Sequence, residues 1–404
     1  MTGSLPPSLR ALGRREFRLY FAGQLVSMTG TWMQQTAQGW LIYRLTGSGT
    51  LLGVTAAVSQ APSVLLGLAG GAAADRLDRR SLLLWTQALA LAQAAVLAAL
   101  TSAGAVTVTH VLILSFLLGV VNAFDMPARQ SFVPQLVPPE DAGNAIALSG
   151  VLLNASRVVG PALAGAVIAA AGEAACFWFN AASYAAMLAS LACIAARPAA
   201  ARTEASALAH IREGLDYAWR DPERRSLLAL LAAVSFAGMP LFSILPAFTE
   251  GALKAGPRGM GLLMGAVGVG ALFASVRLAR RADAEGLPRA LGLGAAAFGA
   301  ALALMGFAPS LPWAMAVAAL AGYGMMTAFS GGNIRLQTRS DDAHRGRLMS
   351  LFTMSFMATA PFGALASGWA ADRFGPRAAV TGGGLLVAAV AAGFLRTRAG
   401  DGRR

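Results

Sequence analysis

The feature that most constrains this chain is a series of charge-free apolar windows, each long enough to cross a lipid bilayer. The hydrocarbon layer is about 30 Å thick, and a helix rises about 1.5 Å per residue, so one crossing needs roughly 20 apolar residues. Single windows of this size lie at Leu19–Tyr43, Leu45–Ala74, Ala174–Ala196, Ser226–Thr249, Gly259–Val276, Leu348–Ala371 and Ala378–Leu395.

Two further windows, Ser81–Phe124 and Ala290–Ile334, are about twice as long, and one more span, Ala145–Ala170, is interrupted only by Arg157. Each long window predicts a hairpin of two helices, with turns near Ser102–Gly104 and at Pro309–Pro312. The windows together predict twelve transmembrane helices.

The composition favours helices over strands and excludes an ordinary water-soluble protein. Only 13% of the residues are charged, whereas about 25% is usual for soluble domains. A membrane barrel would alternate apolar and polar residues in segments of about ten, but these windows are apolar throughout and rich in small residues that let membrane helices pack closely. We therefore expect an all-α membrane protein.

The distribution of the 32 Lys and Arg residues predicts the orientation of the helices. With the N-terminus in the cytoplasm, 26 lie on the inner side, five on the outer side, and Arg157 in the membrane. This asymmetry follows the positive-inside rule and puts both termini in the cytoplasm. The net charge of +13 is explained by topology, so we do not expect nucleic-acid binding.

The chain divides into two similar halves. The long windows occupy the middle of each half, and an offset of 200 residues aligns Asp141 with Asp341 and Pro161 with Pro361. We expect a six-helix half at 1–196, a cytoplasmic linker at 197–225 and a second half at 226–404, as in transporters built from parallel repeats. The linker contains a predicted amphipathic helix, one face of which carries Leu208, Ile211, Leu215 and Trp219. The simplest interpretation of this helix is a spacer that tethers the two halves.

A charged motif, Gly71-Ala-Ala-Ala-Asp75-Arg76-Leu-Asp78-Arg79-Arg80, lies between the second and third helices. It resembles the G-x-x-x-D-R-x-G-R-R loop of the major facilitator superfamily, with Asp78 where the family prefers Gly. The resemblance implies a gating charge relay of Asp75, Arg76 and Arg79 with an acid on the fourth helix, here Asp125. A plain positively charged turn is the alternative. Gly368–Arg377 matches the pattern too, but it falls between the last two helices and is interpreted as an outer turn.

The fifth helix carries Ser156-Arg157-Val-Val-Gly160-Pro161-Ala-Leu-Ala164-Gly165. This is similar to the antiporter motif of superfamily exporters, G-x-x-x-G-P-x-x-G-G, in which small residues and Pro give a close-packed, bendable helix. The motif (Arg157, Gly160, Pro161, Gly165) implies efflux, and a purely structural kink is the alternative. Gly39–Gly53, Asp125–Leu148, Ile211–Pro222 and Arg345–Leu351 resemble the branch of siderophore exporters and macrolide efflux pumps.

Polar residues inside the spans are candidates for the transport path. On the first helix Gln24, Met28, Thr31, Gln35 and Gln38 form one stripe. The candidate cavity residues are Gln24, Thr31, Trp32, Gln35, Gln38, Gln60 and Asn154. Hydrogen bonding between helices is an equally good interpretation of the stripe. Arg157 needs a partner or a water-filled cavity. Asp125 is the nearest acid in the predicted arrangement, but it belongs near the inner membrane edge and can pair with Arg157 directly only if the fifth helix projects into the cytoplasm.

These features predict a secondary exporter of small amphipathic molecules in the inner membrane, driven by proton antiport. An uptake permease is the alternative within transport. A membrane enzyme would need a His, Cys or metal constellation that the sequence does not offer, and no repeated segment suggests a channel filter. We expect no cofactor, with the proton gradient as the energy source. We expect the lipid bilayer and a small-molecule substrate as partners, and the chain to be monomeric.

Overall fold

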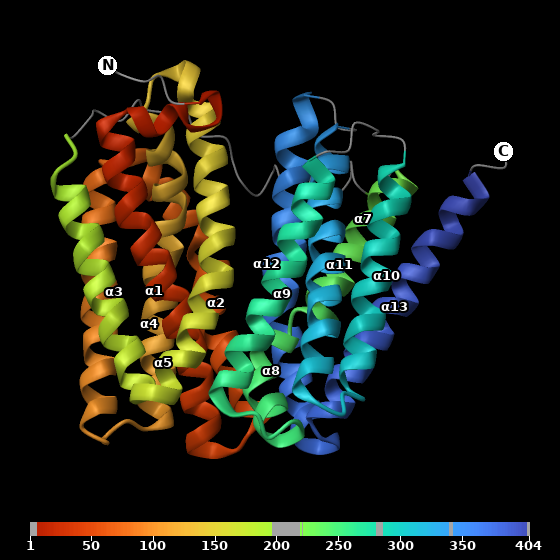
Figure 1. Cartoon of the computed structure of the whole chain (residues 1–404). Helices are drawn as coiled ribbons and strands as arrows, with labels where there is room; N and C mark the ends of the chain where they lie inside the picture. The colour runs from red at the N-terminus through yellow and green to blue at the C-terminus, as the bar shows by residue number, and fades with distance from the viewer. Residues whose placement is uncertain (1–5, 196–218, 220, 280–285, 339–341, 402–404) are drawn as a thin grey trace. The chain divides into compact units, whose positions relative to one another are not determined.

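The computed structural model describes residues 6–195, 219, 221–279, 286–338 and 342–401, and throughout these ranges the regular secondary structure is helical (Figure 1). The all-α fold is therefore confirmed. Contacts divide the chain into two compact units, which are described one by one: unit 1 is Met1–Leu41 with Val58–Thr203, and unit 2 is Ile42–Ala57 with Glu204–Arg404. The predicted halves at 1–196 and 226–404 stay predictions. Leu208, Ile211 and Leu215 of the predicted linker helix lie outside the described residues.

Unit 1 consists of long helices preceded by a short 3-10 segment, η1 (Pro7–Gly13). Its helices are α1 (Arg15–Thr46), α2 (Gly49–Arg76), α3 (Arg79–Ser102), α4 (Val108–Phe132) and α5 (Ala142–Ala192). The last turn of α1 and the first turns of α2, which flank the α1–α2 turn, belong to unit 2. The turn predicted at Ser102–Gly104 is present, with Gly104 at φ +68°. Gly172, at φ 77° and ψ 176°, divides α5 into two helical segments.

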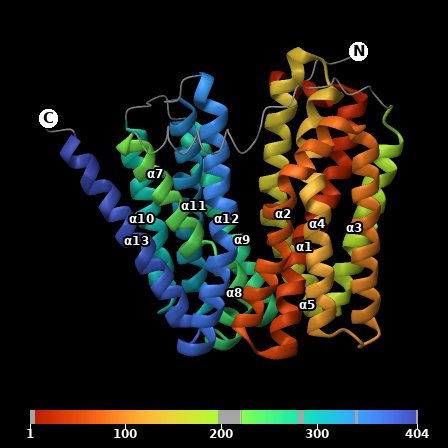
Figure 2. The ribbon, with the colours of Figure 1, turned by 180° about the vertical axis from the view of Figure 1, so that it is seen from behind.

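The interior of unit 1 is built from aromatic, aliphatic and small side chains. Near the start of α1, Phe17 and Tyr20 are buried, and Tyr20 meets Phe132 of α4 edge-on at 5.8 Å between ring centroids. Further along, a Cβ added to Gly30 would lie 2.6 Å from Oδ1 of Asn180, so α1 approaches the second segment of α5 closely. This close packing brings polar side chains of α1 next to those of α3, α4 and α5. Figure 2 shows the ribbon of these helices from behind.

Unit 2 begins with a helix that is irregular along its length. It runs as α7 (Pro222–Ala233), a π-helical turn η4 (Val234–Gly238), α8 (Leu241–Ala247) and a second π-helical turn η5 (Phe248–Ala252). Pro240 and Pro246 account for the breaks, because proline cannot donate the backbone hydrogen bond. The remaining helices are α9 (Gly256–Ala279), α10 (Leu287–Met305), α11 (Leu311–Thr338), α12 (Asp342–Phe374) and α13 (Pro376–Asp401).

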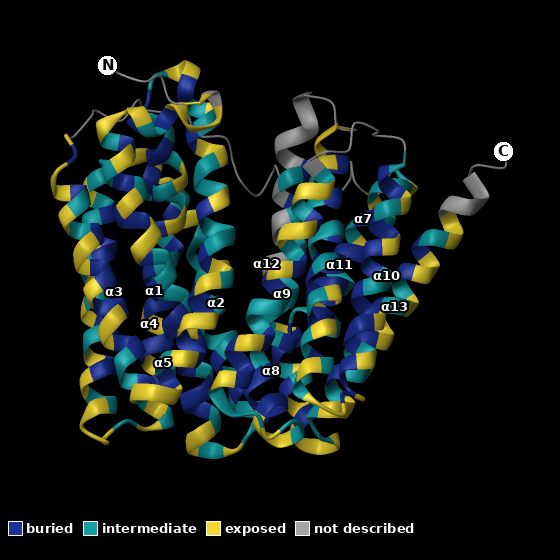
Figure 3. Cartoon of the chain, viewed as in Figure 1, coloured by how far each residue is buried: buried dark blue, intermediate teal, exposed yellow. Residues whose placement is uncertain are grey.

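Every apolar window of the sequence thus contains a helix. Among the described residues, nine helical stretches are long and apolar enough to cross a membrane. The stretch Pro139–Ala192 counts once although Gly172 interrupts it, and α1 is not one of the nine because its glutamines lower its mean hydropathy. In Figure 3 the yellow exposed positions alternate with dark blue buried ones along the helices, as expected when each helix has one packed side.

Candidate functional site

The loop between α2 and α3 is organised by its own charged residues. Asp78, which stands where the superfamily prefers Gly, caps α3 by accepting a hydrogen bond from the backbone N–H of Ser81 at 2.8 Å. Arg79 is buried and donates to the carbonyl oxygen of Ala74 at 3.1 Å. Arg80 donates to the carbonyl oxygens of Leu191 and Ala192, at the end of α5. The loop therefore fastens the ends of α2, α3 and α5 to one another.

Asp125 lies on α4, is 4% exposed, and has every hydrogen-bonding direction occupied. Oδ1 accepts from the hydroxyl of Thr86 at 2.9 Å and from Nε2 of Gln87 at 2.8 Å, both on α3. Oδ2 accepts from Nε of Arg129 at 2.9 Å and from a second guanidinium nitrogen of the same side chain. Arg129 also contacts Sδ of Met28 on α1 at 3.4 Å. The result is a buried, charged node joining α1, α3 and α4.

The predicted relay of Asp75, Arg76 and Arg79 with Asp125 stays a prediction. In this conformation the hydrogen bond of Arg79 is to Ala74, and Asp75 is exposed at the end of α2. The direct pair of Arg157 with Asp125 is not formed in the described structure, because the carboxylate is held by Arg129.

The predicted cavity residues, taken together with Gln34 of α1, divide into two groups. One group bonds to other helices of unit 1: Gln34 donates to Oε1 of Gln93 at 3.0 Å and accepts from Nδ2 of Asn180 at 2.8 Å. Gln38 donates to the hydroxyl of Ser115 at 2.7 Å, and the hydroxyl of Thr31 lies 3.2 Å from that of Tyr184. These residues join α1 to α3, α4 and α5 inside the bundle.

The second group lacks such bonds among the described residues. Gln35 is exposed, Gln60 on α2 is half-buried, and neither has a hydrogen-bond partner there. Oε1 of Gln24 and Nε1 of Trp32 are buried atoms without a partner. Asn154 donates only within its own helix, to the carbonyl oxygen of Gly150 at 3.0 Å. Among the described residues, these five predicted cavity residues therefore make no hydrogen bond to another helix.

The motif on α5 lies directly against α1. A Cβ added to Gly160 would be 2.5 Å from Cβ of Trp32 and 2.9 Å from the carbonyl oxygen of Thr29, so only glycine fits there. The hydroxyl of Thr29 lies 3.5 Å from that of Ser156, and the guanidinium carbon of Arg157 is 5.1 Å from the ring centroid of Trp32. Pro161 and Gly165 are buried in the same segment, and the break in the helix is at Gly172 rather than at Pro161.

The second motif match is a turn, as predicted, and it contains specific hydrogen bonds. Asp372, near the end of α12, accepts from the backbone N–H of Gly49 at 2.5 Å and of Thr50 at 2.8 Å, and from the hydroxyl of Ser48. Partial burial raises the pKa of Asp372, but hydrogen bonds from Thr50, Ser48 and Gly49 together lower that pKa further, so it lies below its ordinary value. The carboxylate thereby caps the N-terminus of α2.

Arg377 closes the same turn from the other side. Its guanidinium donates to the carbonyl oxygens of Gly306 and Ala308 at 2.9 Å and to that of Ala252 at 3.0 Å. Gly375, at φ +87°, supplies the left-handed conformation between α12 and α13. The acid and the base that resembled the gating motif therefore bind helix ends within unit 2.

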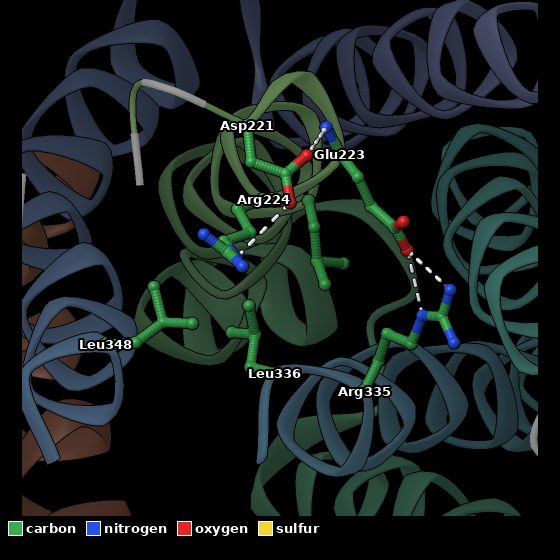
Figure 4. Close-up of a pocket in the computed structure, with 7 residues that line it drawn as sticks. Asp221, Glu223, Arg224, Arg335, Leu336 and Leu348 are labelled. Carbon is green, nitrogen blue, oxygen red and sulfur yellow. Dashed lines mark hydrogen bonds and ion pairs between the residues drawn. The ribbon is translucent and has the colours of Figure 1, made fainter. Parts of the chain in front are cut away.

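Unit 2 contains a small polar cavity of about 60 Å³ at the start of α7 (Figure 4). Nε of Arg335 donates to Oε1 of Glu223 at 2.8 Å, while Asp221 caps α7 and pairs with Arg224 at 3.2 Å. Leu336 and Leu348 complete the lining. Drug-sized ligands occupy pockets of about 300–1,000 Å³, so this cavity is too small to hold one. The ion pair of Arg335 with Glu223 joins α11 to α7 there.

Sequence reasoning missed several of these residues. Arg129 is one of the 26 basic residues assigned to the inner side from the sequence. Its i,i+4 spacing from Asp125 is the signal that could have indicated an ion pair on one helix face. Gln93, Ser115, Asn180 and Tyr184 are single polar residues in apolar spans and carry no pattern of their own. Their role is visible only once the helices are packed.

The long apolar helices and the polar network buried between them define a helical membrane protein. The solved structure of the nucleoside transporter NupG is similar to this chain, with a TM-score of 0.75 and 11% sequence identity. The match covers 95% of this chain and 98% of the NupG chain, which shows a shared fold. A family model described as transmembrane secretion effector matches residues 7–402, and the chain belongs to this family of the major facilitator superfamily. The resemblance inferred from the motifs is thereby confirmed.

Two relatives cover most of the chain. The staphyloferrin A transporter of Staphylococcus aureus (strain NCTC 8325 / PS 47) is 24% identical over 361 residues, covering 89% of this chain and 90% of that protein. The multidrug efflux pump Tap of Mycobacterium tuberculosis (strain ATCC 25618 / H37Rv) is 27% identical over 380 residues, covering 89% of this chain and 87% of the pump.

Proposed function

We propose that this protein is a secondary active exporter of small amphipathic molecules that works by alternating access and proton antiport. It is a monomer in the inner membrane, with twelve spans and both termini in the cytoplasm, and it needs no cofactor beyond the proton gradient. The proposal is supported by the relatives, which are named as a staphyloferrin A transporter and a multidrug efflux pump, and by the efflux-type motif on α5.

The observation that carries the mechanism is the buried pair of Asp125 and Arg129. Asp125 directly follows the charge-free window Ser81–Phe124 and is 4% exposed, and ionisable residues buried within membrane helices are costly and commonly functional. Protonation of Asp125 would remove the negative charge that holds Arg129, and with it a constraint between α3, α4 and α1. A proton taken up there would therefore favour a different arrangement of these helices, which is the coupling that antiport requires.

Inside-out membrane vesicles with an imposed proton gradient test this proposal. The probes are ethidium, erythromycin and the amphipathic carboxylate dansylglycine. We expect gradient-driven accumulation of at least one probe, and loss of that accumulation in Asp125→Asn. Flux that is unchanged in Asp125→Asn would contradict the coupling role, and accumulation without a gradient would contradict antiport.

The uptake permease is the competing function, and the direction of transport separates the two. Intact cells that produce the protein should hold less of the transported probe than cells without it. If the cells instead hold more, and the excess collapses when the gradient is dissipated, the protein is a permease.

The twelve-span topology is tested by cysteine labelling from either side of the membrane. Cys176 and Cys193 are first replaced by alanine, and single cysteines are then placed at Gly104, Pro309 and Asp78. We expect a membrane-impermeant maleimide to label the first two from outside and Asp78→Cys only in inside-out vesicles. The reverse pattern would overturn the orientation.

A further inference from the structure

Arg157 lies at the middle of the first segment of α5, where a charge is hardest to accommodate. The segment runs from Ala142 to the break at Gly172, so Arg157 is 15 residues from either end, or roughly 22 Å at 1.5 Å per residue. The bilayer midplane is about 15 Å from its polar boundary, and a side chain there cannot reach the headgroups along its own helix. An isolated Arg at a helix centre costs about 2.5–3.5 kcal/mol on insertion scales.

Within the described residues, no carboxylate neutralises Arg157. Asp125, the acid considered as its partner, is fully occupied by Arg129, Thr86 and Gln87. The contact recorded for Arg157 is the cation–π contact with Trp32 at 5.1 Å. Such contacts contribute about 0.5–2 kcal/mol and satisfy none of the five N–H donors of a guanidinium.

The position of Trp32 is fixed by the packing of α1 on α5. Gly160 admits Cβ of Trp32 where any larger residue would collide, and Ser156 lies beside Thr29 one turn away. The indole ring is therefore a rigid platform for the guanidinium. Among the described residues, Nε1 of the same ring is a buried donor without an acceptor, so the indole ring and the guanidinium both have N–H groups left for a ligand.

Arg157 is accessible although it lies on the packed side of α5. At about 100° per residue, it points to the same side as Gly160 and Ala164, which are buried, and away from the exposed Val151 and Val159. Arg157 itself is exposed, and Asn154, one turn earlier on this side, is half-buried. The guanidinium is thus held against α1 and is still open to a ligand.

We propose that Arg157, stacked on Trp32, binds the carboxylate of an anionic amphipathic substrate; this rests on the proposed function and gives it a substrate class. A guanidinium offers paired donors that match the two oxygens of a carboxylate, and the ligand supplies both the missing counter-charge and the missing acceptors. The indole face favours an aromatic or apolar group next to the carboxylate. A lipophilic cation is disfavoured at this position by repulsion.

A lipid phosphate could supply the same negative charge, but the depth of Arg157 argues against it. Phosphates lie beyond the edge of the hydrocarbon layer, whereas Arg157 is at the centre of its helical segment. The test therefore compares nanodiscs of zwitterionic lipid with nanodiscs that contain anionic lipid. Competition by anionic lipid equal to that by the soluble probe would identify the lipid as the ligand and overturn the substrate assignment.

The experiment uses the full-length protein in nanodiscs and two matched fluorescent probes, dansylglycine and its neutral amide. We expect the wild type to bind dansylglycine about tenfold more tightly than the amide. Arg157→Gln should remove this preference, Arg157→Lys should keep part of it, and Trp32→Leu should weaken binding of both probes. Arg258→Gln, which removes an exposed guanidinium at the start of α9, is the control for net charge and should leave the preference intact.

The outcomes separate this inference from the exporter proposal. Equal binding of the two probes by the wild type, or an unchanged preference in Arg157→Gln, overturns the carboxylate site. If the preference depends on Arg157 but vesicles transport no probe under a gradient, the site stands and the exporter proposal fails. If vesicles transport ethidium under a gradient but the protein binds dansylglycine and its amide equally, the exporter proposal is supported and the carboxylate site is contradicted.

Discussion

Asp125 and Arg129 lie one turn apart on α4, and Nε of Arg129 is 2.9 Å from Oδ2 of Asp125. The other carboxylate oxygen accepts from Thr86 and Gln87 on α3. The acid that the loop motif implicates in a charge relay is therefore the centre of a buried network in which each of its oxygens accepts two hydrogen bonds. Any gating role for Asp125 has to begin with the disruption of this network.

Asp125→Asn should destabilise the protein and uncouple it. The change leaves Arg129 buried next to a neutral amide, and removal of one partner of a buried ion pair costs about 3 kcal/mol. Thermal unfolding in detergent measures the loss of stability, and gradient-driven flux in vesicles measures the coupling. The double variant Asp125→Asn/Arg129→Met removes both charges, so it should regain most of the stability without regaining the flux. A single variant as stable as wild type would contradict the importance of the pair.

Gly160→Ala should loosen the packing of α5 against α1. The added methyl group meets Cβ of Trp32 at 2.5 Å and the carbonyl oxygen of Thr29 at 2.9 Å, and such overpacking costs about 1–3 kcal/mol. Gly150→Ala on the same helix is the matched control, because its Cβ meets nothing within 4 Å. That change should be neutral or stabilising by up to about 1 kcal/mol. Equal effects on the unfolding temperature would show that α1 and α5 are not in close contact.

Gln34 and Gln35 are neighbours in sequence with different expected roles. Gln34→Leu removes the bonds to Gln93 and Asn180 and should cost about 1–2 kcal/mol, since each bond between membrane helices contributes about 0.6 kcal/mol and the partners are left unpaired. Gln35 is exposed, so Gln35→Leu should change stability by less than about 0.5 kcal/mol. It should instead change the flux of at least one probe severalfold. Unchanged flux for the whole probe panel would remove Gln35 from the transport path.

The cap that Asp372 places on α2 should be insensitive to pH across the physiological range. Its hydrogen bonds lower the pKa below the ordinary value of about 3.9. A lowered pKa means that the stabilisation is complete above the ordinary pKa and is lost only as pH falls through the still lower folded value. The difference in unfolding temperature between wild type and Asp372→Ala should therefore be constant from pH 8 to pH 5. A difference that shrinks over this range would show that Asp372 takes up a proton there.

Much of the fold follows from local sequence properties. Charge-free windows of about 20 residues predict helices wherever the structure has them, because a backbone in hydrocarbon has to satisfy its own hydrogen bonds. Gly104 and Gly375 mark turns because they adopt positive φ. The break at Gly172 falls in the gap between the predicted spans Ala145–Ala170 and Ala174–Ala196. The π-helical turns of the seventh span were not predicted, although Pro240 and Pro246 signal an irregular helix.

The sequence by itself determined the class of protein, the helices and the residues that could carry charge inside the membrane. It could not determine their partners, because side chains distant in sequence meet only when helices pack. The tertiary structure decided that Asp125 pairs with Arg129 and that Gln34 and Gln38 join α1 to other helices. It also decided that Arg157 packs against Trp32, where its N–H groups have no hydrogen-bond acceptor among the described residues. In a bilayer an unpaired polar group is costly, so the arrangement of partners decides which polar residues hold the bundle together and which remain for a substrate.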